Sequence, residues 1–223
     1  MNSLLDEGYW QKRLNVVKKA LERNNFEVYL VQDPVGAKDV IIKQILPKTG
    51  ARRISWGDSM TVIESGLFDE IKRRTDLEFL DIFEKGIPLE DFFERRRQAL
   101  LVDLFITGTN AVTRKGQLVN LDMLGNRIGA ITFGPTHVVI MVGRNKIVAD
   151  LEAAMDRIKN YSAPANAIRH NAEHPEMNPP CLETATCSNC TNPMRICNTW
   201  TITEKSFPSG RIKVVLINQD LGL

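Results

Sequence analysis

The chain has 223 residues, of which 43% are hydrophobic and 25% charged, and its formal net charge is +2. This balance is typical of a soluble globular protein with a core. The small net charge argues against nucleic acid as a partner, because phosphate binding usually requires a basic excess or a basic face. The apolar runs are too short to span a bilayer, and the opening MNSLLDEGYW lacks the pattern of a signal peptide. We therefore expect a cytoplasmic protein.

The first half of the chain predicts helices that alternate with short apolar strands. The first segment is expected to be helical, with Leu14, Val17 and Leu21 on one face. Further helices are expected over 36–46, 60–74 and 89–101, and strands over 26–31, 53–56, 79–82 and 102–106. This alternation indicates an α/β fold with a mostly parallel, Rossmann-like sheet flanked by helices.

The second half predicts more closely spaced strands. Strand-like runs cover 117–121, 128–133, 137–142 and finally 212–217, a helix is expected over 150–160, and residues 162–180 are rich in Ala, Asn and Pro. The runs in the middle are linked by Gly and Asn turns, which suggests an antiparallel section.

All four cysteines lie near the C-terminus, at Cys181, Cys187, Cys190 and Cys197. Their spacing is C-x5-C-x2-C-x6-C, and the C-x2-C step lets two thiolates face one metal from a tight turn. Two disulfides or four unused thiols are the alternative, but cytosolic disulfides are rare. The sequence therefore predicts a metal site in a Cys-rich loop. Four thiolates suit either structural zinc or a [4Fe–4S] cluster, and we slightly favour the cluster.

Polar turns at the ends of predicted strands are candidate binding sites. Gly57, Asp58 and Ser59 follow a strand and open a helix, a geometry that offers N–H groups and a hydroxyl to an anion; a plain helix N-cap is the commoner alternative. Ligands of α/β sheets bind outside the carboxyl ends of strands. The candidate ligand-binding residues are Gly57, Ser59, Thr61, Gly108, Thr109, Asn110, Asn126, Arg127, Gly134, Asn145 and Lys146.

Two carboxylates in these regions are candidate catalytic residues. Glu64 lies one turn into the helix that follows Ser59, and Asp122 lies in the turn that contains Asn126 and Arg127. Either could act as a general base or nucleophile. A solvated helix residue is the simpler interpretation of Glu64. Arg127 could clamp a carboxylate or phosphate.

Several segments resemble one family. They are GDSMT (57–61) with Glu64, ITGTNAVTRKGQLVNLD (106–122), GNRIGAITFGP (125–135) and GRNKIV (143–148). Together they resemble the LUD-domain proteins, the LutC/YkgG-like lactate-utilization family, over residues 10–160. The tail, with APANAIRH before the cysteines, is similar to a variant of that family with a cysteine-rich end.

The resemblance implies a fold like that of the NagB/RpiA/CoA-transferase superfamily, with a LUD-like domain over 1–160. Residues 161–223 are then a Cys-rich metal-binding tail whose closing strand returns to the main domain. It also implies a role in oxidising L-lactate to pyruvate with iron–sulfur partner proteins. Thr109 and Asn110 stand where sugar-phosphate isomerases of that superfamily place an acidic catalytic residue, which argues against isomerase activity.

The leading hypothesis is a LUD-type subunit that binds a small anionic metabolite in lactate or 2-hydroxy-acid metabolism and carries its own four-thiolate centre. One alternative is a stand-alone enzyme of CoA-transferase or sugar-phosphate type that uses Glu64 or Asp122. Another is a non-catalytic anion-binding protein with structural zinc. Oligomerisation is compatible with each of them.

Overall fold

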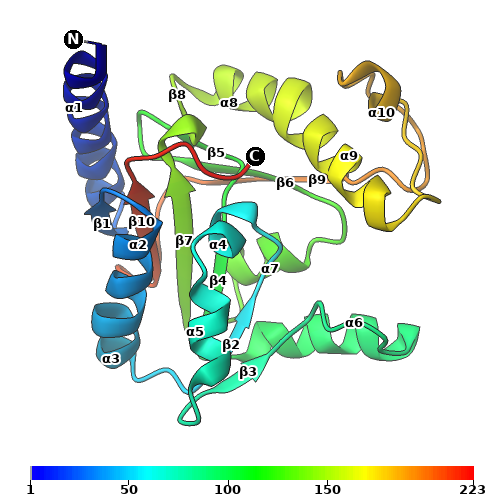
Figure 1. Ribbon diagram of the computed structural model, residues 1–223, viewed down its shortest axis with the longest axis horizontal. Helices are drawn as coiled ribbons and strands as arrows, with labels where there is room; N and C mark the ends of the chain where they lie inside the picture. Colours follow the sequence, from blue (N-terminus) through cyan, green and yellow to red (C-terminus); the bar gives the residue numbers. More distant parts are fainter. Residues whose placement is uncertain (1) are drawn as a thin grey trace.

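Six parallel strands form the central sheet of the computed structural model, which describes residues 2–223 (Figure 1). Their order is β1 (Glu27–Val31), β10 (Ile212–Ile217), β7 (His137–Gly143), β4 (Leu104–Gly108), β2 (Arg53–Trp56) and β3 (Glu78–Leu80). The strands β10, β7 and β4 are apolar and almost fully buried, as expected for central strands of a parallel sheet covered on both faces. The predicted parallel α/β sheet is thus confirmed.

Alternate side chains of these strands pack against opposite faces. Val139, Met141 and Val215 belong to the core cluster formed with the helices from α2 to α5. Val138 and Ile140 belong to the cluster on the other face, which contains α1, α7 and parts of a second sheet. The covering elements are α1 (Asn2–Arg23), α2 (Pro34–Val40), the π-helix η1 (Ile41–Ile45), α3 (Leu46–Thr49), α4 (Met60–Glu64), α5 (Leu67–Arg73) and α7 (Asn126–Thr132).

The second sheet is small and mixed. Its order is β8 (Ile147–Val148), β5 (Ala111–Thr113), β6 (Leu118–Asp122) and β9 (Thr199–Thr203). Strand β6 is antiparallel to both β5 and β9. An antiparallel section is therefore present, but of the runs predicted for it only 117–121 belongs to it, because 128–133 is helical and β7 pairs in parallel within the main sheet. The segment that contains the cysteines connects α9 (Ala163–Glu173) to β9. After β9 the chain enters the main sheet as β10, between β1 and β7. The predicted boundary at residue 160, between the main domain and the Cys-rich tail, stays a prediction.

Two further groups of helices extend to one side of the central strands (Figure 1). The first is α6 (Leu89–Gln98) with the 3₁₀ turn η2 (Ala99–Leu101). The second is α8 (Leu151–Arg157), the π-helix η4 (Ile158–Ser162), α9 (Ala163–Glu173) and the short α10 (Cys181–Thr184); a 3₁₀ turn, η3 (Arg144–Lys146), precedes β8. None of the helices within residues 2–223 has the length and apolarity needed to cross a membrane.

Some predicted elements differ from the structure. The strand expected over 128–133 is the helix α7, because Gly125 turns the chain with a φ of 88° and Ile128 and Ile131 are both buried at helical spacing. The expected helix over 60–74 is interrupted at Gly66, whose φ is 66°. The segment 162–180 contains the helix α9, which continues from η4 without a break in the helical backbone, and Pro164, which has no N–H to donate, lies just after this π-helical turn. Strands β5, β8 and β9 were not predicted.

Candidate functional site

The carboxyl ends of β2, β4 and β7 meet at one edge of the sheet because these strands are parallel and β4 pairs with both others. Three of the predicted segments follow these ends directly. Ser59 lies three residues after β2, Asn110 follows β4, and Lys146 ends the 3₁₀ turn after β7. The parallel arrangement therefore brings together polar residues that are far apart in the sequence, as expected for a ligand site of an α/β sheet.

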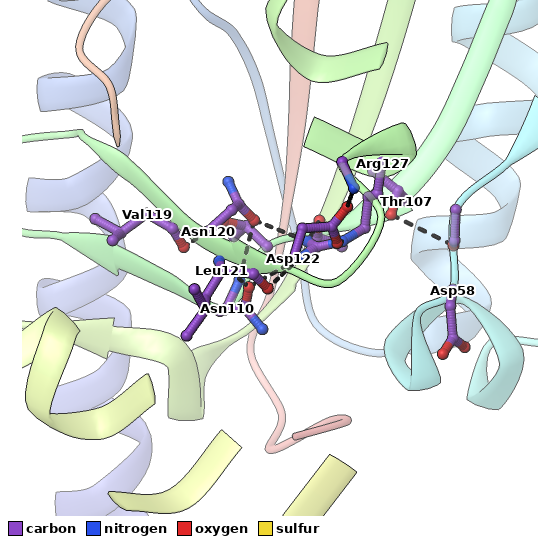
Figure 2. Close-up of polar contacts among 12 residues, drawn as sticks. Asp58, Thr107, Asn110, Val119, Asn120, Leu121, Asp122 and Arg127 are labelled. Carbon is purple, nitrogen blue, oxygen red and sulfur yellow. Dashed lines mark hydrogen bonds and ion pairs between the residues drawn. The ribbon is translucent and has the colours of Figure 1, made fainter. Parts of the chain in front are cut away.

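Two glycines allow the chain segments at this edge to approach closely. A Cβ on Gly108 would lie 2.5 Å from the Ser59 Oγ atom, and a Cβ on Gly57 would lie 2.8 Å from the Thr107 Oγ1 atom. The Thr107 hydroxyl donates a hydrogen bond to the Gly57 carbonyl, drawn as a dashed line in Figure 2. A larger residue at either position would push the loop before α4 away from β4.

Ser59 occupies the N-cap position of α4, but its side chain makes no capping hydrogen bond. The residue is 8% exposed, and its hydroxyl has no hydrogen-bond partner among the described residues. A buried hydroxyl normally has a partner, because leaving it unpaired costs about 1–3 kcal/mol. Ser59 also lines a cavity, so its unpaired hydroxyl is a candidate donor to a ligand there.

Lys146 is a buried lysine on the same cavity, only 4% exposed. Its Nζ atom donates a hydrogen bond to the Thr61 Oγ1 atom at 2.8 Å. Burial, together with the nearby charges of Arg157 and Arg127, lowers the pKa of Lys146 to about 7, against a small opposing effect of Glu64. The ammonium form is therefore costly without an anion beside it, and a bound carboxylate would stabilise that form.

Arg127 organises the turns around it. Its five N–H groups all meet acceptors: Nε donates to Asp122 Oδ1, Nη1 to Asn120 Oδ1 and the Gly108 carbonyl, and Nη2 to Asn110 Oδ1 and the Leu121 carbonyl. Figure 2 shows these side chains converging at the ends of β4 and β6. With its donors occupied, Arg127 supports the shape of the cavity wall, and the predicted clamp on a ligand would require some of these bonds to be exchanged.

A charged cluster also lines the cavity. The Asp58 carboxylate pairs with the guanidinium of Arg169 and lies 3.3 Å from His170 Nε2, so α9 is joined to the loop before α4. Burial alone would raise the pKa of Asp58, but the hydrogen bond from His170 and the charge of Arg169 outweigh it, and the net pKa is lowered. In Figure 2 the Asp58 carboxylate points away from the Arg127 network.

Helix α6 contributes aromatic rings and a cation. The Arg96 guanidinium lies 3.4 Å from the centroid of the Phe92 ring and 5.0 Å from that of Phe83. Desolvation lowers the pKa of Arg96 to about 10, so it remains cationic at neutral pH. Within the part of the chain that the structure describes, its one hydrogen bond goes to the Phe92 carbonyl, and no carboxylate forms an ion pair with it.

These groups line a cavity of about 500 Å³ that is partly open to solvent. Eight of the predicted ligand-binding and catalytic residues line it, and they share a position at the strand ends: Ser59, Gly108, Thr109, Asn110, Asp122, Asn126, Arg127 and Lys146. The sequence interpretation missed the wall formed by α6 and α9. The sequence did contain two indications of this wall, the adjacent phenylalanines in α6 and the adjacent Arg169 and His170 in α9. Only the fold shows that both helices contribute to the cavity at the strand ends.

The remaining predicted residues do not line the cavity. Thr61, Glu64 and Asn145 hold the C-terminal tail: the Gly222 N–H donates to Glu64 Oε2 at 3.0 Å, and Asn145 Nδ2 donates to the Gly222 carbonyl. Gly57 lies beside Thr107 and the Arg127 stem, and Gly134, beyond α7, packs on Leu100. Among the two predicted catalytic carboxylates, Asp122 lies on the cavity, with one oxygen bonded to Arg127 and the other to the Gly125 N–H.

The four cysteines lie around a second, much smaller cavity. All four are free thiols, and all four line a space of about 20 Å³ with Ala163, Pro164, Pro179, Ser188, Arg195 and Ile196. Burial, and to a smaller extent the three neighbouring thiols, raise the pKa of Cys181. Within residues 2–223, however, no group of three or more His, Cys, Asp or Glu side chains has an arrangement that could hold a metal ion as it stands. The donor set suits a thiolate-bound metal, and binding would require the loop to close around the ion.

Comparisons with known proteins agree with the fold. A crystal structure of a DUF162 family protein from Deinococcus radiodurans is similar, with a TM-score of 0.52 and 12% sequence identity, covering 94% of this chain and 98% of that chain. No curated protein matches significantly. The family model described as the LUD domain matches residues 14–217, nearly the whole chain. The chain therefore belongs to the LUD-domain family.

Proposed function

We propose that this LUD-domain protein takes part in lactate utilization and binds lactate, or a related 2-hydroxy acid and its 2-oxo product, in the cavity at the strand ends. Family membership supports the role, since the resemblance links LUD proteins to the oxidation of lactate to pyruvate. The observation that carries the proposal is that an unpartnered hydroxyl, on Ser59, and a buried amine, on Lys146, line the same cavity, because these two groups together suit a carboxylate.

The residues of this chain would bind and orient the acid. The Lys146 ammonium and the Ser59 hydroxyl hold the carboxylate, while the Arg127 network fixes Asn110 and Asp122 at the cavity wall. Oxidation of the 2-hydroxyl group releases two electrons and two protons, and the electrons pass to an acceptor outside the cavity, such as the iron–sulfur partner proteins that the family resemblance implies. A nucleophilic role for Glu64 or Asp122 has less support, because both carboxylates accept hydrogen bonds from neighbouring N–H groups.

We further propose that the protein is the variant of the family with a cysteine-rich end and that its four thiolates hold a metal centre. The family resemblance favours a [4Fe–4S] cluster, which would supply electron transfer. A single zinc ion is the alternative, because four thiolates also form a tetrahedral structural zinc site. Metal content distinguishes the two.

Calorimetric titration of lactate and pyruvate into the wild-type protein and Ser59→Ala tests the binding proposal. We expect binding to weaken about 10-fold or more in Ser59→Ala, because a hydrogen bond to a charged group contributes about 1.5–3 kcal/mol. Ser55→Ala is the matched control: Ser55 is also buried, but its hydroxyl donates to the Leu80 carbonyl and does not line the cavity. Equal affinities for the wild-type protein and Ser59→Ala would refute the assignment.

A further inference from the structure

The lining of the cavity contains two chemically different groups of residues. One group, at the strand ends, is polar and includes Ser59, Asn110 and Lys146. The other group is apolar, with Phe92 and Phe93 of α6 and Met177 and Met194 of the segment after α9, and it stands beside charged side chains such as Arg96. A ligand that contacts both groups must therefore carry an anionic group and an apolar group.

The size of the cavity points in the same direction. A volume of about 500 Å³ lies within the range of about 300–1,000 Å³ that is typical of sites for drug-sized ligands. A three-carbon acid bound at Ser59 and Lys146 would fill only part of this volume and leave water against the phenylalanine and methionine side chains. An apolar group on the ligand would displace this water and gain affinity in proportion to the buried area.

Arg96 indicates that the apolar group is a ring. Its guanidinium lies over the Phe92 ring and lines the cavity, so this wall offers a delocalised cation as well as aromatic surface. Such a surface attracts the face of an aromatic ring more strongly than an aliphatic group of the same size. Met177 and Met194, which also line the cavity, have flexible and polarizable side chains, and methionine makes favourable contacts with ring edges.

We propose that the ligand of this cavity is a carboxylic acid with an aromatic group, of the arylalkyl 2-hydroxy-acid class, with its carboxylate at Ser59 and Lys146 and its ring against Phe92, Phe93 and Arg96. The inference rests on the proposed function for the position of the carboxylate. It goes further because lactate becomes the smallest of the 2-hydroxy acids that the cavity is proposed to bind.

Titration of the full chain with lactate, phenyllactate and cyclohexyllactate tests the inference. We expect phenyllactate to bind about 10- to 100-fold more tightly than lactate, from burial of the ring, and more tightly than cyclohexyllactate, from its contact with Arg96. Phe93→Ala should remove most of the advantage of phenyllactate and leave lactate affinity unchanged. Phe133→Ala is the control, because Phe133 is 86% exposed and does not line the cavity.

The outcomes distinguish the two proposals. Equal affinities for lactate and phenyllactate would overturn the inference and leave the proposed function standing, and so would an advantage that persists in Phe93→Ala. A preference for cyclohexyllactate would overturn the aromatic assignment. Binding of phenyllactate without lactate would support the inference and exclude lactate itself as the ligand. Binding of neither acid would overturn both proposals.

Discussion

Lys146 determines how the candidate site responds to pH. Its amine has no carboxylate ion-pair partner among the described residues, and burial lowers its pKa to about 7. In the unfolded chain a lysine has a pKa of about 10.4. Between these two values the unfolded state binds more protons than the folded state, so the contribution of Lys146 to stability rises with pH from about 7 upward and is least favourable below 7.

The binding of an anion should show the opposite dependence. If the carboxylate requires the ammonium form, affinity for pyruvate should be about 10-fold higher at pH 6 than at pH 8, because the protonated fraction falls by about that factor around a pKa of about 7. Calorimetry at the two pH values measures it. Lys146→Met should lose most of this pH dependence, although His170 and His174 still line the cavity in that variant.

Lys213→Met is the control for this prediction. Lys213 is equally buried, at 3% exposed, but it lies on β10, contacts His137 and does not line the cavity. An unchanged pH dependence in Lys146→Met, or the same loss in Lys213→Met, would contradict the assignment of Lys146.

At the scale of elements, the β6–α7 turn is held by one buried arginine. Arg127 connects the end of β4, the end of β6 and the start of α7, and its ion pair with Asp122 is largely shielded from solvent, with side chains 10% and 12% exposed. Removing the guanidinium would leave the Asp122 carboxylate and the Asn110 and Asn120 amide oxygens without this donor. A buried charge that loses its partner is much more costly than an exposed one.

We therefore predict that Arg127→Met lowers the free energy of unfolding by about 3–5 kcal/mol, as measured by urea denaturation. Arg97→Met is the comparison, because the Arg97–Glu94 pair is exposed and should contribute less than about 1 kcal/mol. A similar small loss for both variants would show that the network around Arg127 is not a structural centre.

At the scale of the whole molecule, the cysteine-rich segment forms part of the wall of the large cavity. Ile196 lines both the small cavity at the cysteines and the large one, and Met194 lines the large one. The last strand, β10, lies inside the main sheet, so the segment is connected to the fold on both sides. Metal binding at the cysteines would therefore order a wall of the candidate site.

For the metal centre, we predict that protein purified without oxygen contains either about four iron atoms per chain with a broad visible absorbance, or about one zinc ion per chain and no colour. Cys187→Ser should lower the metal content and the melting temperature, since metal binding and local folding are coupled. Ser188→Ala changes a neighbouring residue on the same small cavity and should preserve both. Unchanged metal content and stability in Cys187→Ser would contradict a metal centre.

The sequence predicted the main sheet well because buried parallel strands are apolar runs, such as 212–217, that local composition reveals. It also identified the polar turns at strand ends, including Ser59, Asn110 and Lys146. It did not reveal that α7 is a helix, because a short run of isoleucine, glycine and alanine fits either element. The wall formed by α6 and α9 depends on contacts between residues more than 100 positions apart, such as Asp58 with Arg169, and no local pattern encodes them.

A crystal structure of the protein soaked with phenyllactate tests the central claim most directly, because it locates the acid. We predict density inside the large cavity, with the carboxylate within hydrogen-bonding distance of Ser59 Oγ and Lys146 Nζ and the ring beside Phe93. Density for the acid only outside this cavity, or a cavity that holds only water at saturating ligand, would contradict the claim.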